Sequence, residues 1–299
     1  MTLTLENALT GISGILVTPY DDAGDIAPKH LAPIVDRALN AGMHMPVVNG
    51  NTGEFYALTT DEACQMAKEV VEMVDGRAPV LAGVGRGIRD AVQLAKASAQ
   101  AGATALMVHQ PPDPFVAPRG VVDYLKAIAD ASGGLPMMIY LRNDTIGTQA
   151  IADLCGVEGV KGVKWATPNP MKLAAAKAAC DPSIVWVGGL AEVWAPSFYA
   201  VGARGFTSGL INIWPEHSMA IHAALEGGDY AKANALIANM EPFEDIRAQE
   251  MNGTNVTGVK AALQAIGQDC GPTRPPSAWP LTPSQKSTME GFLKANYLV

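Results

Sequence analysis

Short hydrophobic runs alternate along this chain with longer stretches in which hydrophobic side chains recur every three or four positions. A short run rich in β-branched and aromatic residues predicts a β-strand, whereas the longer recurrence predicts an amphipathic helix. Eight runs predict strands, at residues 11–20, 44–50, 78–85, 103–110, 135–141, 160–167, 184–189 and 205–210. Because a helical stretch follows each of them, the pattern indicates strand–helix units around a parallel sheet.

The predicted helices carry boundary residues at both ends. Residues 28–42 begin with a proline, residues 59–76 begin with a threonine, and both stretches end on a glycine. Proline in the first turn, a hydroxyl at the N-cap and a closing glycine are typical of helix boundaries. Eight strand–helix units in a chain of 299 residues predict the α/β class and a (β/α)8 TIM barrel, which typically needs about 250 residues.

The pattern changes after residue 228. From there on it is purely helical, with stretches at 229–249, 258–267 and 282–296. We therefore predict two parts: a (β/α)8 barrel over residues 1–228 and a C-terminal helical region over residues 229–299. No low-complexity stretch or linker separates them.

Two lysines lie three positions apart in the predicted sixth strand. Side chains of a strand alternate between its faces, so Lys161 and Lys164 point in opposite directions. The face of Lys164 carries Val160, Gly162 and Ala166, and the face of Lys161 carries Val163, Trp165 and Thr167. Small residues leave room for a long side chain, so Lys164 is predicted to point into the barrel. Lys161, at the start of the strand, is predicted to reach water.

A lysine among apolar walls pays a desolvation penalty when charged, which lowers its pKa. A neutral amine in a barrel mouth is the nucleophile that forms a Schiff base with a ketone or aldehyde. The alternative is a rim lysine paired with an acid. The spacing of the strand does not decide between these two interpretations of Lys164.

The segment "NGNTGEFYALT", residues 49–59, follows the second predicted strand. Gly50 and Gly53 allow a tight turn that presents successive backbone N–H groups, and Asn51 and Thr52 add side-chain donors. This combination suits a carboxylate, although a glycine-rich turn with a polar cap would look the same. Tyr140, near the end of the fifth strand, lies where barrel enzymes place their chemistry and could relay protons or simply pack.

Composition narrows the function. The chain has 48% hydrophobic residues and a net charge of −8, without a cluster of Lys and Arg, which argues against nucleic-acid or anionic-membrane partners. It has neither a basic and apolar leader nor a run of 18 apolar residues, so we expect a cytoplasmic location. Four scattered cysteines predict reduced, buried thiols, and five histidines lack metal-ligand spacing, so no metal site is expected.

Taken together, these segments resemble the family of dihydrodipicolinate synthase and N-acetylneuraminate lyase. The matching pieces are "VTPYDDAG", "GNTGEFYALT", "MIY", "KGVKWAT", the glycines at 188–189, "GFTSGLINIWP", "GVKAALQAIG" and "RPPSAWPLT", in that order across the chain. The resemblance implies a class I lyase in which Lys164 forms an imine with a 2-keto acid and no separate cofactor is used. It implies Tyr140 as the proton relay, Asn51 and Thr52 as the carboxylate site, and Glu54 as a structural acid of the turn. A general base is the alternative role for Glu54.

The departures from the synthases are informative. Those enzymes carry Thr at the position of Asn51, a Tyr in the loop after strand four and an Asn after the relay Tyr. Here the loop reads "HQPPDPF", Leu141 follows Tyr140, and Arg142 comes closer to Tyr140 than the synthase arginine does. The lysine-pathway reaction is therefore not expected.

Within the family, the pattern is most similar to the decarboxylating 5-dehydro-4-deoxyglucarate dehydratases. The shared features are the TGEF segment, a Tyr followed two places later by Arg, glycines ending strand seven, and "EPFEDIRAQEMNGTNVTGVKAAL" near the C-terminus. The strand-eight segment "FTSGLIN" lacks the Tyr-Ser-Ser run of that group. A 2-keto-3-deoxy sugar acid is the substrate that this resemblance favours.

A mouth rich in hydrogen-bond donors suits the hydroxyls and second carboxylate of such a substrate. The predicted substrate-binding residues are Gly50, Asn51, Thr52, His109, Arg142, Asn143, Gly189 and Ser208, with Asn49 nearby. His109 could instead be a hydrogen-bonded rim residue. Two alternatives stay open: a pyruvate-dependent aldolase or synthase, and a keto-acid-binding protein without catalysis. The family's habit of tetramers built from dimers predicts a homo-oligomer.

Overall fold

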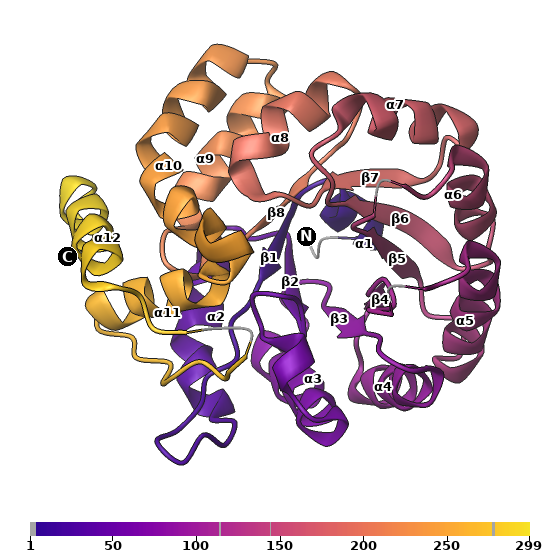
Figure 1. Cartoon of the computed structure of the whole chain (residues 1–299), viewed down its shortest axis with the longest axis horizontal. Coiled ribbons are helices and arrows are strands. Elements are labelled where there is room, and N and C mark those ends of the chain that lie inside the picture. Colours follow the sequence, from indigo (N-terminus) through magenta and orange to yellow (C-terminus); the bar gives the residue numbers. More distant parts are fainter. Residues whose placement is uncertain (1–3, 114, 144, 277–278) are drawn as a thin grey trace.

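Eight parallel strands close into a barrel in the computed structural model, which describes residues 4–113, 115–143, 145–276 and 279–299 (Figure 1). The strands are β1 (Ile12–Ile15), β2 (Met45–Val48), β3 (Leu81–Val84), β4 (Ala105–Val108), β5 (Met137–Leu141), β6 (Val160–Trp165), β7 (Val185–Gly188) and β8 (Phe206–Ser208). Each strand pairs with its neighbour in sequence, and β8 pairs with β1. The predicted (β/α)8 TIM barrel is confirmed.

Helices cover the outside of the barrel, and short 3-10 helices, labelled η, lie in the connections between strands and helices. They are η1 (Pro28–Leu31), α2 (Ala32–Asn40), η2 (Phe55–Ala57), α3 (Thr60–Val74), α4 (Ile88–Ala101), α5 (Pro118–Ala131), α6 (Thr148–Cys155), α7 (Pro170–Ala179), α8 (Ala191–Ala200), η3 (Leu210–Asn212) and α9 (Pro215–Glu226). The predicted start of α3 is a full capping box, in which Thr59 and Glu62 satisfy each other's backbone N–H groups.

The Lys164 side chain points into the barrel, as the sequence predicted. Lys164 is buried and lies beside Tyr140, its register partner on β5, whereas Val163 and Trp165 pack in the outer core between strands and helices. Lys161 is exposed. The prediction for Val160 is wrong, because it packs in the outer core. The β5–β6 register shifts between Met137 and Met138, so strict alternation begins only after Lys161.

The start of the chain contributes an element that the hydrophobic pattern did not indicate. Helix α1 (Leu5–Leu9) begins at Thr4, whose side chain accepts a hydrogen bond from the Asn7 N–H. Ala8 and Leu9 join the inner barrel cluster, which also includes Met138 and Tyr140. Figure 1 shows α1 and the N-terminus near the barrel axis. The helix therefore closes one end of the barrel interior.

Three further helices follow the barrel: α10 (Tyr230–Asn252), α11 (Asn255–Ala265) and α12 (Pro283–Ala295). Helix α10 packs on α8 and α9, and α11 packs on η3 near the end of β8 (Figure 1). The backbone leaves helical geometry at Gln249–Met251, which turns the chain from α10 into α11. Within the described residues, none of the helices combines the length and apolarity needed to span a membrane.

Candidate active site

Lys164 lies at the centre of the candidate site. Its side chain is buried on β6, and its Nζ lies 4.1 Å from the centroid of the Tyr140 ring. Burial lowers the pKa of Lys164 to about 7, and the positive charges of Arg142 and Arg247 add to this effect. A large share of the amine is therefore neutral at neutral pH, the form that attacks a carbonyl.

Tyr140 faces Lys164 from the neighbouring strand and is linked to the turn after β2. The Asn51 Nδ2 donates a hydrogen bond of 3.0 Å to the Tyr140 hydroxyl oxygen. Burial raises the pKa of Tyr140 to about 12, so the phenol keeps its proton. Because Asn51 donates to the oxygen, the phenolic hydrogen is left to donate to a bound molecule.

The turn at residues 50–54 presents backbone donors. The Gly53 N–H donates to the Gly50 carbonyl and the Glu54 N–H donates to the Asn51 carbonyl, each at 3.0 Å. Within the described part of the chain, the N–H groups of Asn51 and Thr52 donate to no protein acceptor. A Cβ on Gly50 would lie 2.4 Å from the Ile15 side chain, so a larger residue there would force Ile15 to shift. Two adjacent free N–H groups form an anion-binding concavity.

The C-terminal helices reach the other side of this turn. The Thr52 hydroxyl lies 3.4 Å from the Asn255 Oδ1, and the Arg247 Nη2 donates to the same Oδ1 at 2.9 Å. Arg247 also pairs with Glu244, and its guanidinium packs so closely on Gly209 that a Cβ there would lie 2.4 Å from Nη2. The sequence analysis assigned Arg247 no role. Its one signal was the "FEDIR" segment, and a helix position alone does not show that it faces the barrel mouth.

His109 supports the turn from the β4 side. The His109 ring stacks on Phe55 at 4.3 Å and lies 5.6 Å from the Tyr140 ring. Its Nε2 is 2.8 Å from the Asn49 carbonyl, which can only accept, so Nε2 carries the hydrogen. Burial lowers the pKa of His109 to about 3 and keeps the ring neutral. This contact matches the rim role that the sequence analysis left open for His109.

Gly189 and Ser208 lie at the ends of β7 and β8. A Cβ on Gly189 would lie 2.8 Å from the Trp165 carbonyl oxygen and 3.0 Å from the Lys164 Cγ, so this glycine lets the strands close around the lysine. Ser208 is fully buried, and its hydroxyl donates to Glu192 at 2.5 Å. Burial raises the pKa of Glu192. The Ser208 hydroxyl is thus already engaged within the protein.

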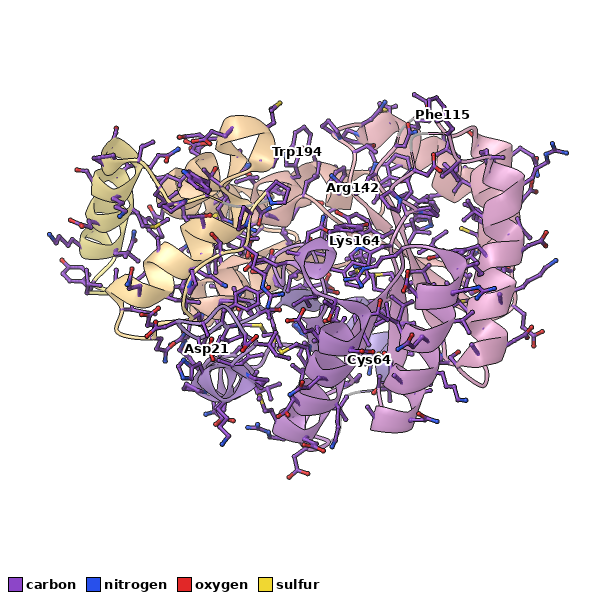
Figure 2. All side chains as sticks on the ribbon, turned by 60° about the horizontal axis from the view of Figure 1, so that its bottom comes forward. Asp21, Cys64, Phe115, Arg142, Lys164 and Trp194 are labelled. Atoms are coloured by element: carbon purple, nitrogen blue, oxygen red, sulfur yellow. The ribbon has the colours of Figure 1, made fainter. Side chains whose placement is uncertain are left out.

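A cavity of about 720 Å³ opens beside Tyr140, over the loops that follow β4 and β5. Its lining includes Tyr56 and His109 as well as Arg142 and Asn143. The backbone N–H groups of Arg142 and Asn143 both donate to the Gln110 side chain, which fixes the loop after β5. In the view of Figure 2, Arg142 lies between Lys164 and the rim that carries Phe115. The cavity therefore leaves room beside Tyr140 for a molecule that extends toward the Arg142 guanidinium.

Comparison with known proteins gives a consistent picture. Residues 8–296 match the model of the "Dihydrodipicolinate synthetase family". The chain is 30% identical to a probable 5-dehydro-4-deoxyglucarate dehydratase from Rhizobium rhizogenes, over 82% of each chain. It is also 30% identical to a 4-hydroxy-tetrahydrodipicolinate synthase from Maridesulfovibrio salexigens, over 99% of this chain and 100% of that one. The crystal structure of dihydrodipicolinate synthase from Oceanobacillus iheyensis superposes with a TM-score of 0.93 at 37% identity, covering 98% of both chains.

Proposed function

Because the chain belongs to the dihydrodipicolinate synthetase family and is a class I lyase, we propose that it acts on a 2-keto-3-deoxy sugar acid through an imine on Lys164. The reaction we favour is dehydration of the 5-dehydro-4-deoxyglucarate type, with or without loss of carbon dioxide. The observation that carries the proposal is the buried Lys164 amine, of lowered pKa, facing the Tyr140 ring at 4.1 Å.

The proposed chemistry begins with binding of the keto acid. Its carboxylate accepts hydrogen bonds from the free N–H groups of Asn51 and Thr52. The Lys164 amine attacks the C2 carbonyl, water leaves, and a protonated imine forms. Loss of a proton from C3 gives an enamine, which can expel the hydroxyl at C4. In each proton transfer, the Tyr140 hydroxyl is the proposed relay.

The remote end of the substrate is assigned to the cavity beside Tyr140. Arg142 suits a second carboxylate, and Asn143 and the polar rim suit hydroxyl groups. The names of several relatives, which are probable 5-dehydro-4-deoxyglucarate dehydratases, support the same substrate class. The loop after β4 carries no Tyr, whereas the synthases have one there near their relay, which argues against the lysine-pathway reaction.

A pyruvate-dependent aldolase or synthase is the second candidate, because a relative of equal identity is named a 4-hydroxy-tetrahydrodipicolinate synthase. A keto-acid-binding protein without catalysis is the third. A homo-oligomer and a cytoplasmic location remain predictions. Dehydration needs no aldehyde acceptor, whereas aldol chemistry exchanges pyruvate with one.

The test is intact mass spectrometry after incubation with pyruvate and borohydride, followed by peptide mapping. We expect one reduced adduct on Lys164 and none in Lys164→Ala. A screen of deoxy-keto sugar acids then separates dehydration, which releases water, from cleavage, which releases pyruvate. A folded protein that yields no adduct with pyruvate or with any longer keto acid would contradict the imine mechanism.

A further inference from the structure

We propose that Lys260 and Arg274, from the C-terminal part of the chain, are positioning residues that hold Glu54 and thereby aim the Asn51 and Thr52 N–H groups at the keto-acid carboxylate. The inference rests on the proposed function, since it concerns the carboxylate end of the same site. It assigns the C-terminal region a share in substrate binding that acts through Glu54 and the turn.

The first contact is a buried ion pair. The Lys260 Nζ lies 2.8 Å from the Glu54 Oε1, with side chains that are 4% and 0% exposed. The same Nζ donates to the Pro272 carbonyl at 2.7 Å, and the Arg274 backbone N–H donates to the Glu54 Oε2 at 2.8 Å. Both carboxylate oxygens of Glu54 are therefore engaged, which removes it as a candidate general base.

Buried ion pairs add little net stability over apolar residues, and their best-attested use is to fix one geometry. The Glu54–Lys260 pair joins the turn after β2 to α11, two parts of the chain that are far apart in sequence. Because burying these two charges costs free energy, stability alone does not explain the pair, and a role in fixing the turn does.

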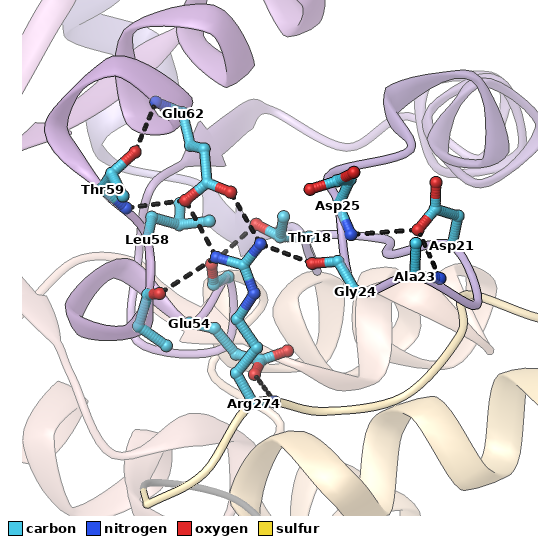
Figure 3. Close-up of polar contacts among 12 residues, drawn as sticks. Thr18, Asp21, Ala23, Gly24, Asp25, Glu54, Leu58, Thr59, Glu62 and Arg274 are labelled. Atoms are coloured by element: carbon cyan, nitrogen blue, oxygen red, sulfur yellow. Dashed lines mark hydrogen bonds and ion pairs between the residues drawn. The ribbon is translucent and has the colours of Figure 1, made fainter.

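The second contact is the Arg274 guanidinium, drawn in Figure 3. It donates to both carboxylate oxygens of Glu62, at 2.8 and 2.6 Å, and to the carbonyls of Ala57 and Gly24, at 3.1 and 2.6 Å. The Tyr20 ring lies 4.2 Å from the Arg274 Cζ and 4.3 Å from the Lys260 Nζ. Arg274 thus ties the segment after the turn to the loop after β1.

The turn needs such support because its backbone is strained. Asn49 and Glu54 both have positive φ, 59° and 55°, a region that non-glycine residues seldom adopt. Asn49 is held on one side, by its side chain to the Ala63 carbonyl and by His109. Glu54 is held on the other side by Lys260 and Arg274. The residues between these two anchors include the proposed carboxylate donors, so release of Glu54 would let their N–H groups turn away.

The experiment compares Lys260→Met with the unchanged chain and with Lys286→Met, an exposed lysine on α12. For each protein, the pyruvate concentration that half-saturates borohydride trapping and the limiting rate at saturation are measured, together with the pyruvate-dependent rise in Tm. We expect Lys260→Met to raise the half-saturating concentration about tenfold or more while the limiting rate changes about threefold or less. Lys286→Met should match the unchanged chain. A merely structural loss would lower the fraction of active protein and the limiting rate without moving half-saturation.

A second variant covers the case in which Lys260→Met fails to fold because Glu54 is left buried without a partner. Glu54→Gln/Lys260→Met removes both charges, and Met cannot donate to the Pro272 carbonyl, so we expect a folded protein whose half-saturating concentration is still raised. Unchanged half-saturation in a folded variant overturns the inference. If the unchanged chain shows the Tm rise but no adduct, the imine proposal fails and the Tm series still decides the positioning role. If it shows neither, both are overturned.

Discussion

At the scale of single residues, the lowered pKa of Lys164 makes imine formation depend on pH in a specific way. With a pKa near 7 instead of 10.5, deprotonation of the Lys164 amine is nearly complete by about pH 8. We predict that the rate of borohydride-trapped adduct at saturating pyruvate rises with pH through about 7 and then levels off. The measurement is initial trapping rates between about pH 5 and pH 9. A rate that keeps rising steeply above pH 8 would mean that Lys164 titrates like an exposed lysine.

The same shift has a consequence for stability. Between about pH 10.5 and about pH 7, the unfolded chain binds a proton at Lys164 that the folded chain lacks. The contribution of Lys164 to the free energy of unfolding therefore becomes less favourable as the pH falls through this range. The fold carries a buried amine that it would be more stable without, which fits a residue retained for chemistry.

Tyr140→Phe separates proton relay from packing. The phenyl ring keeps the apolar contacts of Tyr140 with the inner barrel cluster and its position over Lys164, and only the hydroxyl that accepts from Asn51 is lost. We predict a fall in kcat of about 10²- to 10⁴-fold with little change in Tm. Steady-state kinetics and circular dichroism check this together. A variant that melts early while its folded fraction keeps the full rate would assign Tyr140 to packing alone.

Features of the candidate site could be predicted from the sequence where they depend on residues that are close together along the chain. The two-residue alternation sufficed for the direction of Lys164, and the glycines of the turn sufficed to suggest exposed N–H groups. Arg247 and Ser208 could not be placed this way, because their surroundings come from Asn255 and Glu192, on other elements. Ser208 looked like a free donor in the sequence and is engaged in the fold.

At the scale of elements, the close approach of β6 and β7 depends on Gly189. In Gly189→Ala, the new methyl group would lie 2.8 Å from the Trp165 carbonyl oxygen and 3.0 Å from the Lys164 Cγ. We predict a loss of about 1–3 kcal/mol in the free energy of unfolding and slower adduct formation at Lys164. The matched control is Gly291→Ala in α12, where a Cβ meets nothing within 4 Å and a gain of up to about 1 kcal/mol is expected. The measurement is urea unfolding of both variants. Equal free energies of unfolding in Gly189→Ala and Gly291→Ala would show that β6 and β7 can move apart without cost.

Strands and helices could be predicted wherever their buried side chains follow a regular pattern along the sequence. All eight strands fall within the predicted runs, because a parallel strand covered on both faces is a short apolar stretch. Helix α1 escaped notice because five residues are too few to show a helical period. The predicted stretch 229–249 ends where the backbone leaves helical geometry, at Gln249–Met251, although the sequence did not show how the chain turns there.

At the scale of the whole molecule, the division at residue 228 stays a prediction, but the two parts share one site. Asn255, to which Arg247 donates a hydrogen bond, contacts one side of the turn that bears Asn51 and Thr52. Lys260 and Arg274 contact Glu54 at its far end. The barrel carries Lys164, the proposed nucleophile, and the C-terminal region contacts the turn that bears the proposed carboxylate donors. From the sequence alone, the helical region over residues 229–299 suggested only a role in contacts between subunits.

Buried histidines give the whole molecule a predicted acid sensitivity. Burial lowers the pKa of His44 to about 4 and that of His109 to about 3. Between about pH 6.5 and these values, the unfolded chain binds protons that the folded chain does not, so the stability is fully present above pH 6.5 and is lost as the pH falls toward 4. Burial raises the pKa of Glu192, which opposes this loss, but the buried histidines outnumber it, so we predict that Tm declines over this range. The lowered pKa of Glu62 adds a further loss below about pH 4.5.

His44 allows that prediction to be tested outside the candidate site. It lies at the opposite end of the barrel from Lys164, where its Nδ1 accepts a 3.0 Å hydrogen bond from the Ile12 N–H and its ring contacts His222. In His44→Asn, the amide oxygen can still accept from Ile12 but does not titrate. We expect a flatter dependence of Tm on pH between about 6.5 and 4, by up to one proton in slope, with His30→Asn on the exposed surface as control. Identical slopes in the two variants would show that burial of His44 does not couple folding to proton binding.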